Sequence, residues 1–226
     1  MLVMSDRQAA RVAGILFIAA TVPFSISVVL LAPVLESPDF LGQLANRSPR
    51  VAAGVLLEIV NHVSVVAIAV VLFPVLTRFS QRLAIGYVAA RSIEAALFAL
   101  VTANLLTLTR LSRGVAAGSP GSEALSTVLL VGHDWNQVTL PFVAFALGAL
   151  ILNYALYQTR LVPRWISIWG LLAAGSILAA RVILLAGVEI SAATVTAMDA
   201  PIFAQEMILA VWLIARGFTV AEPGES

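Results

Sequence analysis

The sequence predicts an all-α fold, a polytopic bundle of about six transmembrane helices with short interfacial helices in the outer loops. Of its 226 residues, 61% are apolar and only 11% are charged, whereas soluble domains are about 45–50% apolar and about 25% charged. The mean hydropathy is +1.01. The apolar residues also form runs of the roughly 20 residues that a membrane-crossing helix needs. We therefore expect an integral membrane protein whose first partner is the lipid bilayer.

The apolar runs are expected to form one transmembrane domain covering residues 1–226. The first run is too long for the core of a signal peptide and has no clear cleavage site, so we expect it to be retained as a span. The last apolar run, Ile202 to Ala215, is short, and we place the start of its span near Asp199. The approximate spans are 11–35, 51–77, 83–109, 135–158, 165–188 and 199–216.

The connections between the spans alternate between tight turns and longer loops. In the first longer loop, Ser37 followed by Pro38 is a typical helix start. It predicts a short helix lying on the membrane, with Phe40, Leu41 and Leu44 facing lipid.

The arginine distribution predicts the orientation in the cell membrane. Seven arginines lie at the termini and in the tight turns, and four lie in the longer connections. Since cytoplasmic loops carry the excess of positive charge, both termini are expected in the cytoplasm. The seven are Arg7, Arg11, Arg78, Arg82, Arg160, Arg164 and Arg216.

Ionisable residues inside the spans are the candidates for function. A charge at the bilayer centre costs about 2.5–3.5 kcal/mol on insertion scales, so such residues need partners, a water-filled cavity or a ligand. Depths estimated from the helix rise place most of them in the outer half. We expect one polar pocket that opens outward and is lined by Glu58, His62, Glu94, Arg181 and Glu206.

Several of these residues also have a purely structural interpretation. Arg91 and Glu94 are three residues apart on one helix face, which predicts a buried ion pair that is satisfied within one helix or shared with other spans. Arg181 and Glu206 would likewise form an interhelical pair. Peripheral candidates, which also read as loop and cap residues at the outer mouth of the fourth span, are His133, Asp134 and Asn136.

Four stretches together resemble a known family. They are "ARVAGILFIAA", "RLAIGYVAARSIEAALFAL", "FALGALILNYALYQTRLVPRWISIWGLLAAG" and "QEMILAVWLIARGF". Their order and spacing resemble a bacterial six-span membrane family catalogued as a domain of unknown function, number 4386. The resemblance implies the six-span architecture and no particular activity. The positions that match its pattern are Ala10, Arg11, Gly14, Arg91, Glu94, Pro163, Arg164, Glu206 and Trp212.

The function favoured by the residues is the binding or transport of a small ligand, a cation or a lipid headgroup in the polar pocket. The alternatives are an intramembrane metal-dependent enzyme and an accessory protein whose buried charges are only ion pairs. A metal would be held by Glu58, His62, Glu94, Glu206 and His133, although no His-Glu-x-x-His motif occurs. The two histidines are also weak candidates for haem ligation.

Cysteine is absent, which excludes thiolate chemistry, and the net charge of +1 indicates no nucleic-acid partner. No catalytic residue, cofactor, bound metal or oligomeric state follows from the sequence.

Overall fold

The computed structural model describes residues 4–46, 48–116, 124–126, 128 and 139–219. It confirms an all-α bundle, with six helices that are long and apolar enough to cross a membrane. The chain is therefore a multi-pass membrane protein. A seventh, short helix, α2, follows the first span. The helices whose bounds lie within the described residues are α1 (Asp6–Leu35), α2 (Phe40–Asn46), α3 (Ser48–Thr77), α4 (Gln81–Ala116), α6 (Leu140–Thr159), α7 (Arg164–Leu185) and α8 (Ala192–Ala215).

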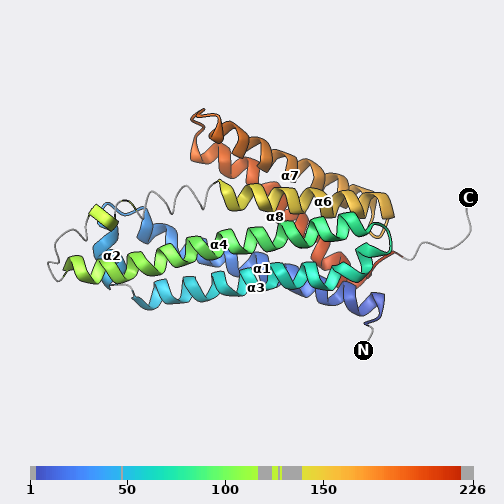
Figure 1. Cartoon of the computed structure of the whole chain (residues 1–226), viewed down its shortest axis with the longest axis horizontal. Coiled ribbons are helices and arrows are strands. Elements are labelled where there is room, and N and C mark those ends of the chain that lie inside the picture. Colours follow the sequence, from blue (N-terminus) through green and yellow to red (C-terminus); the bar gives the residue numbers. More distant parts are fainter. Residues whose placement is uncertain (1–3, 47, 117–123, 127, 129–138, 220–226) are drawn as a thin grey trace, which may run out of the picture.

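The six long helices form a closed ring in the order of the chain. Helix α1 packs against α3, α3 against α4, α4 against α6, α6 against α7 and α7 against α8, and α8 returns to α1. Figure 1 shows these helices side by side along the long axis of the molecule. Because the ring closes, side chains from distant parts of the sequence meet in its interior.

An even number of spans brings the start of α1 and the end of α8 to the same end of the bundle (Figure 1). Two contacts hold the chain together there. Arg78, in the turn between α3 and α4, forms a 2.7 Å ion pair with Asp6 of α1. The backbone N–H of Thr219 donates a 2.8 Å hydrogen bond to the carbonyl of Leu161, in the turn between α6 and α7.

Two glycines allow close contacts between helices. A Cβ atom added to Gly14 of α1 would lie 2.6 Å from the carbonyl oxygen of Ala210 on α8. A Cβ atom added to Gly54 of α3 would lie 2.8 Å from the side chain of Leu31 on α1. Small residues let helix backbones approach in this way, which increases van der Waals contact where there is no hydrophobic driving force between helices.

The short helix α2 differs from the sequence expectation at its start and on its buried face. It begins at Phe40, not Pro38, because Asp39 caps it by accepting a 3.2 Å hydrogen bond from the N–H of Gly42. Leu44 does not face lipid. It is fully buried in a cluster that includes Leu31 and Leu105, because α2 packs on α4.

Helix α8 begins at Ala192, earlier than the expected start near residue 199. Ser191 caps it by accepting a 3.1 Å hydrogen bond from the N–H of Thr194. The sequence hides these first turns because the continuous apolar run starts only at Ile202. As a result Glu206 lies about 21 Å from the start of α8, from the rise of about 1.5 Å per residue.

Candidate functional site: an intramembrane pocket

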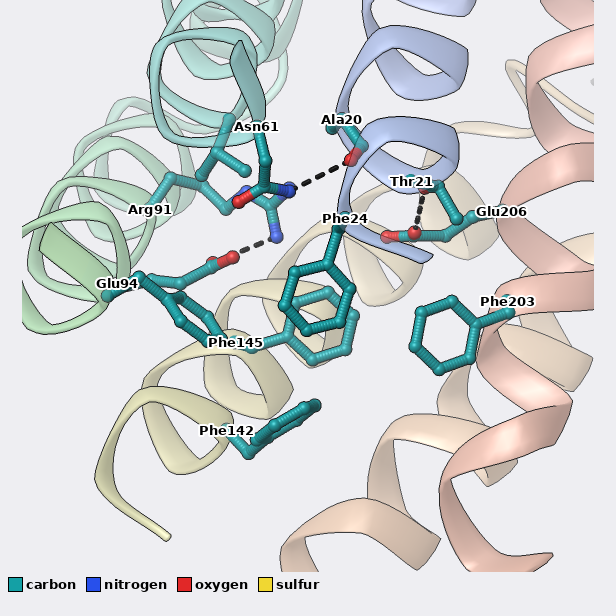
Figure 2. Close-up of a pocket in the computed structure, with 12 residues that line it drawn as sticks. Ala20, Thr21, Phe24, Asn61, Arg91, Glu94, Phe142, Phe145, Phe203 and Glu206 are labelled. Carbon is teal, nitrogen blue, oxygen red and sulfur yellow. Dashed lines mark hydrogen bonds and ion pairs between the residues drawn. The ribbon is translucent and has the colours of Figure 1, made fainter. Parts of the chain in front are cut away.

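The interior of the ring contains a pocket that encloses about 390 Å³ of empty space, counting space that is open to its surroundings. Five of the six long helices contribute to it, each near its middle except α6, which contributes from its first two turns. Figure 2 shows the lining side chains and labels Phe24, Phe142, Phe145 and Phe203 among the phenylalanines. The lining residues are Ala20, Thr21 and Phe24 of α1, Asn61 and Val65 of α3, Arg91, Glu94 and Phe98 of α4, Phe142 and Phe145 of α6, and Phe203 and Glu206 of α8.

Arg91 and Glu94 form an ion pair in the pocket wall. The distance from Arg91 Nη1 to Glu94 Oε2 is 2.9 Å, and both side chains are 3% exposed. The spacing of three residues along α4 puts both on one helix face. The guanidinium also lies 5.5 Å from the ring centroid of Phe145. Gly148 of α6 leaves room for the Arg91 side chain, since a Cβ atom at Gly148 would be 3.1 Å from Arg91 Cδ.

Glu206 is the second carboxylate of the pocket, and it has a weaker partner. Its Oε2 accepts a 2.9 Å hydrogen bond from the hydroxyl of Thr21 on α1. Within the part of the chain that the structure describes, Glu206 belongs to no ion pair, although Arg91 is near enough for their charges to interact. With two carboxylates and one guanidinium ionised, the formal charge of the lining is −1.

Phenyl rings form most of the remaining wall. The ring centroids of Phe24 and Phe98 are 5.7 Å apart, as are those of Phe98 and Phe142. Phe24 and Phe203 are nearly parallel, with centroids 6.4 Å apart. Phe145 extends the cluster beside Phe142. Because the face of a phenyl ring carries partial negative charge, this wall is apolar and yet attracts cations.

Glu58 and His62 form a separate cluster with Thr102 of α4 and do not line the pocket. Thr102 donates a 2.7 Å hydrogen bond to Glu58 Oε2, and its hydroxyl lies 3.0 Å from Nε2 of His62. The spacing of four residues does put both groups on one face of α3. That face is turned toward Thr102, while the neighbouring Asn61 reaches the pocket and donates to the carbonyl of Ala20 at 3.0 Å.

Arg181 pairs with Asp199, not with Glu206. The distance from Arg181 Nη2 to Asp199 Oδ2 is 2.6 Å, and the guanidinium lies 4.5 Å from the ring centroid of Phe142. Helices α7 and α8 are antiparallel neighbours, so the end of α7 lies beside the start of α8. Asp199 of α8 is this partner, and Arg181 is absent from the pocket lining.

A second hollow of about 250 Å³ continues from the pocket toward the end of the bundle that holds the termini. Arg91 and Glu206 line both spaces. Beyond them lie Tyr87 of α4 and an amide pair in which Gln205 donates to Asn153 Oδ1 at 3.1 Å. The described residues offer no hydrogen-bond partner to the hydroxyl of Tyr87. A line of polar groups thus extends along the interior of the ring.

The family model for a domain of unknown function (DUF4386) matches residues 12–217. The chain belongs to the DUF4386 family. This confirms the resemblance seen in the sequence and agrees with the six spans. The comparisons with curated proteins and with solved structures gave no significant match.

Sequence reasoning missed the uncharged members of the site in this DUF4386 chain. Thr21, Asn61 and Thr102 lie inside apolar runs, and a single hydroxyl or amide there carries only a small insertion cost, so it does not stand out. The five phenylalanines show no common spacing. Asp199 stands at the start of the expected last span, and nothing in its local sequence indicates that it meets Arg181.

Three peripheral candidates of the DUF4386 chain, His133, Asp134 and Asn136, lie outside the described residues. Among the described residues, no group of three or more His, Cys, Asp or Glu side chains is arranged to hold a metal ion. The carboxylates and His62 expected to share such a site are divided between the pocket and the Thr102 cluster.

Proposed function

We propose that the pocket binds an organic cation, meaning an ammonium group on a free amine or on a lipid headgroup. The observation that carries this proposal is Glu206. It is 8% exposed, has only the Thr21 hydroxyl as hydrogen-bond donor among the described residues, and borders a pocket walled by phenyl rings. An incompletely neutralised carboxylate inside a membrane is costly unless a cation or proton accompanies it.

The charge balance supports a cation over an anion. The charge of the Arg91 guanidinium is already balanced by Glu94, whose Oε2 lies 2.9 Å from Nη1, so an anionic ligand would meet no net positive charge. The second carboxylate leaves the lining with a formal charge of −1. A monovalent cation would bring the site to neutrality.

The aromatic wall supports an organic cation over a metal ion. Ca²⁺ and Mg²⁺ require six or more oxygen ligands, whereas the lining contains five phenyl rings and few oxygens. Phenyl faces bind ammonium and quaternary ammonium groups by cation–π attraction, worth about 0.5–2 kcal/mol for each well-placed ring.

We further propose that the ligand enters from the outer face of the cell membrane and that both termini are cytoplasmic. Arginines gather at the end of the bundle that holds the termini, as cytoplasmic ends do. Phe142 lies in the first turn of α6, which starts on the opposite side. The phenyl wall of the pocket therefore lies on the side of the pocket that is farther from the termini.

The test is binding of tetramethylammonium to the purified full chain in nanodiscs of phosphatidylglycerol, measured by calorimetry. Glu206→Gln should weaken binding at least about tenfold, equivalent to about 1.4 kcal/mol. Glu189→Gln, which changes an exposed carboxylate after α7, is the matched control and should leave binding unchanged. Phe203→Leu should weaken binding by a smaller factor.

A second arm identifies the source of the ammonium group. If the ligand is a lipid headgroup, nanodiscs containing phosphatidylcholine should compete with tetramethylammonium, and native mass spectrometry should retain that lipid on the unaltered chain. If it is a free amine, the lipid should have no effect. Equal binding by the unaltered chain and Glu206→Gln, with both folded by thermal melting, would exclude this site.

A purely structural role is the second candidate, and the ion pairs favour it. Arg91 and Arg181 both find carboxylate partners within 3 Å, so these charges can hold the ring together without a ligand. In that case the Glu206→Gln chain would lose stability, and the unaltered chain would not bind tetramethylammonium.

A further inference from the structure

The cluster of Glu58, Thr102 and His62 lies outside the pocket and joins two ionisable groups through one hydroxyl. Glu58 on α3 is 6% exposed. Its Oε2 is 2.7 Å from Thr102 Oγ1, and its Oε1 accepts a 3.4 Å hydrogen bond from Ser27 of α1. On the other side of the same hydroxyl, His62 Nε2 is 3.0 Å away. Thr102 is therefore the common neighbour of a carboxyl group and an imidazole.

The neighbours of His62 determine which ring nitrogen carries hydrogen in its neutral form. Asn61 must turn its NH₂ group toward the carbonyl of Ala20, 3.0 Å away, because a carbonyl can only accept. Asn61 Oδ1 then faces His62 Nδ1 at 3.2 Å. Since this oxygen also only accepts, Nδ1 carries a hydrogen. The proton on Nε2 is the one that remains variable.

Two hydrogen arrangements with the same total charge satisfy the carboxyl group of Glu58, the hydroxyl of Thr102 and the imidazole of His62. In the first, Glu58 is protonated on Oε2 and donates to Thr102, whose hydroxyl donates to a bare Nε2. In the second, Nε2–H of an imidazolium donates to Thr102, whose hydroxyl donates to the Glu58 carboxylate. The first arrangement becomes the second when Glu58 gives its proton to Thr102 Oγ1 and Oγ1 gives its own proton to His62 Nε2. Two O–H bonds break in this step, and one O–H bond and one N–H bond form.

A third arrangement accommodates one more proton. The carbonyl of Phe98 lies 3.2 Å from Thr102 Oγ1 and can accept its hydrogen. Oγ1 then accepts from both a protonated Glu58 and an imidazolium, using its two lone pairs. With the Phe98 carbonyl as a further acceptor, Glu58, Thr102 and His62 therefore hold either of two proton numbers without leaving a donor or acceptor unpaired.

We propose that Glu58, Thr102 and His62 form a proton relay inside the membrane, in which the Thr102 hydroxyl passes a proton between the Glu58 carboxyl group and His62 Nε2. Chains of Glu and His side chains serve as proton paths in other membrane proteins. This relay does not rest on the proposed ligand of the pocket, although Asn61 contacts both sites.

The surroundings leave the two groups to interact mainly with each other. Ser27 is the polar side chain that faces Glu58 from α1, and the ring of Phe98 on α4 stacks on His62 with centroids 6.0 Å apart. Helix α2 carries no ionisable side chain. The other charged residues in the middle of α4, Arg91 and Glu94, are paired in the pocket wall. None of the ion pairs among the described residues includes Glu58 or His62.

The first test measures the unaltered chain and uses one variant only to assign the signals. The full chain, labelled with ¹⁵N-histidine and placed in nanodiscs without added ligand, is studied by NMR, and the signals lost in His62→Gln assign His62. Neutral His62 should carry its hydrogen on Nδ1, with Nε2 accepting a hydrogen bond. A neutral form with hydrogen on Nε2 would overturn the relay.

The second test asks whether the two groups exchange a proton. As pH is varied, the infrared C=O band of protonated Glu58, assigned by its loss in Glu58→Gln, and the His62 nitrogen signals should change over the same pH range, as interacting sites do. Thr102→Val removes the hydroxyl and should separate the two transitions. Thr102→Ser keeps a hydroxyl and should restore their coincidence.

The matched control is Thr107→Val, because Thr107 lies on the same helix, is exposed and bonds only to its own backbone at Ala103. It should behave as the unaltered chain. If Thr102→Val and Thr107→Val give the same transitions as the unaltered chain, the hydroxyl does not couple the two groups and the relay is excluded. If Thr102→Val does not fold, the first test still decides, because a neutral His62 with its hydrogen on Nε2 overturns the relay.

Discussion

The hydroxyl of Thr21 on α1 donates a 2.9 Å hydrogen bond to Glu206 on α8, across 185 residues of sequence. This bond closes the ring of helices at mid-height, where the first and last spans meet. The same two helices touch closely at Gly14 and Ala210. Glu206 therefore has a structural partner on one oxygen and the pocket beside it.

Thr21→Val should destabilise the chain by about 1–3 kcal/mol, because it leaves a buried carboxylate without its donor. Interhelical hydrogen bonds in membranes average only about 0.6 kcal/mol, so a value above this average would indicate that Glu206 is ionised. The measurement is unfolding in detergent by circular dichroism. Thr107→Val removes an exposed hydroxyl bonded only to its own helix and should have no comparable effect.

Breaking the Arg91–Glu94 pair should cost more than removing both charges. Glu94→Gln leaves a guanidinium that is 3% exposed without its counter-charge, a loss of about 3–5 kcal/mol for a fully buried pair. Glu94→Gln combined with Arg91→Met should be more stable than Glu94→Gln alone. Additive losses in this double-mutant cycle would mean that the two side chains do not interact.

The pair of Arg181 and Asp199 should behave differently from the exposed pair of Arg78 and Asp6. The Arg181 side chain is 1% exposed and that of Asp199 is 13% exposed. Asp199→Asn should therefore destabilise the chain by an amount near the lower end of about 3–5 kcal/mol. The Arg78 and Asp6 side chains are 53% and 54% exposed, and Asp6→Asn should leave the melting temperature nearly unchanged. Equal effects of the two variants would contradict the difference in burial.

Two glycines of α7 should respond in opposite ways to alanine. A Cβ atom at Gly170 would overlap the side-chain amide of Asn153 on α6, whereas one at Gly175 meets nothing within 4 Å. Gly170→Ala should cost about 1–3 kcal/mol through overpacking. Gly175→Ala should be neutral or stabilising by up to about 1 kcal/mol, since alanine is the better helix former. Thermal melting of the two variants decides between them.

The orientation can be tested with reporter fusions. A reporter fused after Ser226 should be cytoplasmic, and one inserted near Gly118, in the connection after α4, should be outside. This expectation follows from the arginine bias and from the even number of spans. The same location for both reporters would contradict six crossings.

The sequence by itself determined the all-α membrane class, because the bilayer requires long apolar helices whatever their neighbours are. It also determined that Arg91 and Glu94 share a helix face, since a spacing of three residues is local helix geometry. The family followed from the order of four stretches, which needs no knowledge of contacts.

Only the tertiary structure decided which distant groups meet. The rotation and axial position of each helix depend on close contacts such as those at Gly14 and Gly54, and these are not encoded in the hydropathy of any single span. They bring Glu206 to Thr21, Glu58 to Thr102 and Arg181 to Asp199. The expected single cavity became a phenyl-walled pocket beside a separate carboxyl–imidazole cluster. The physical reason is that neighbouring positions on α3 face different helices, so Asn61 reaches the pocket while Glu58 and His62 face Thr102.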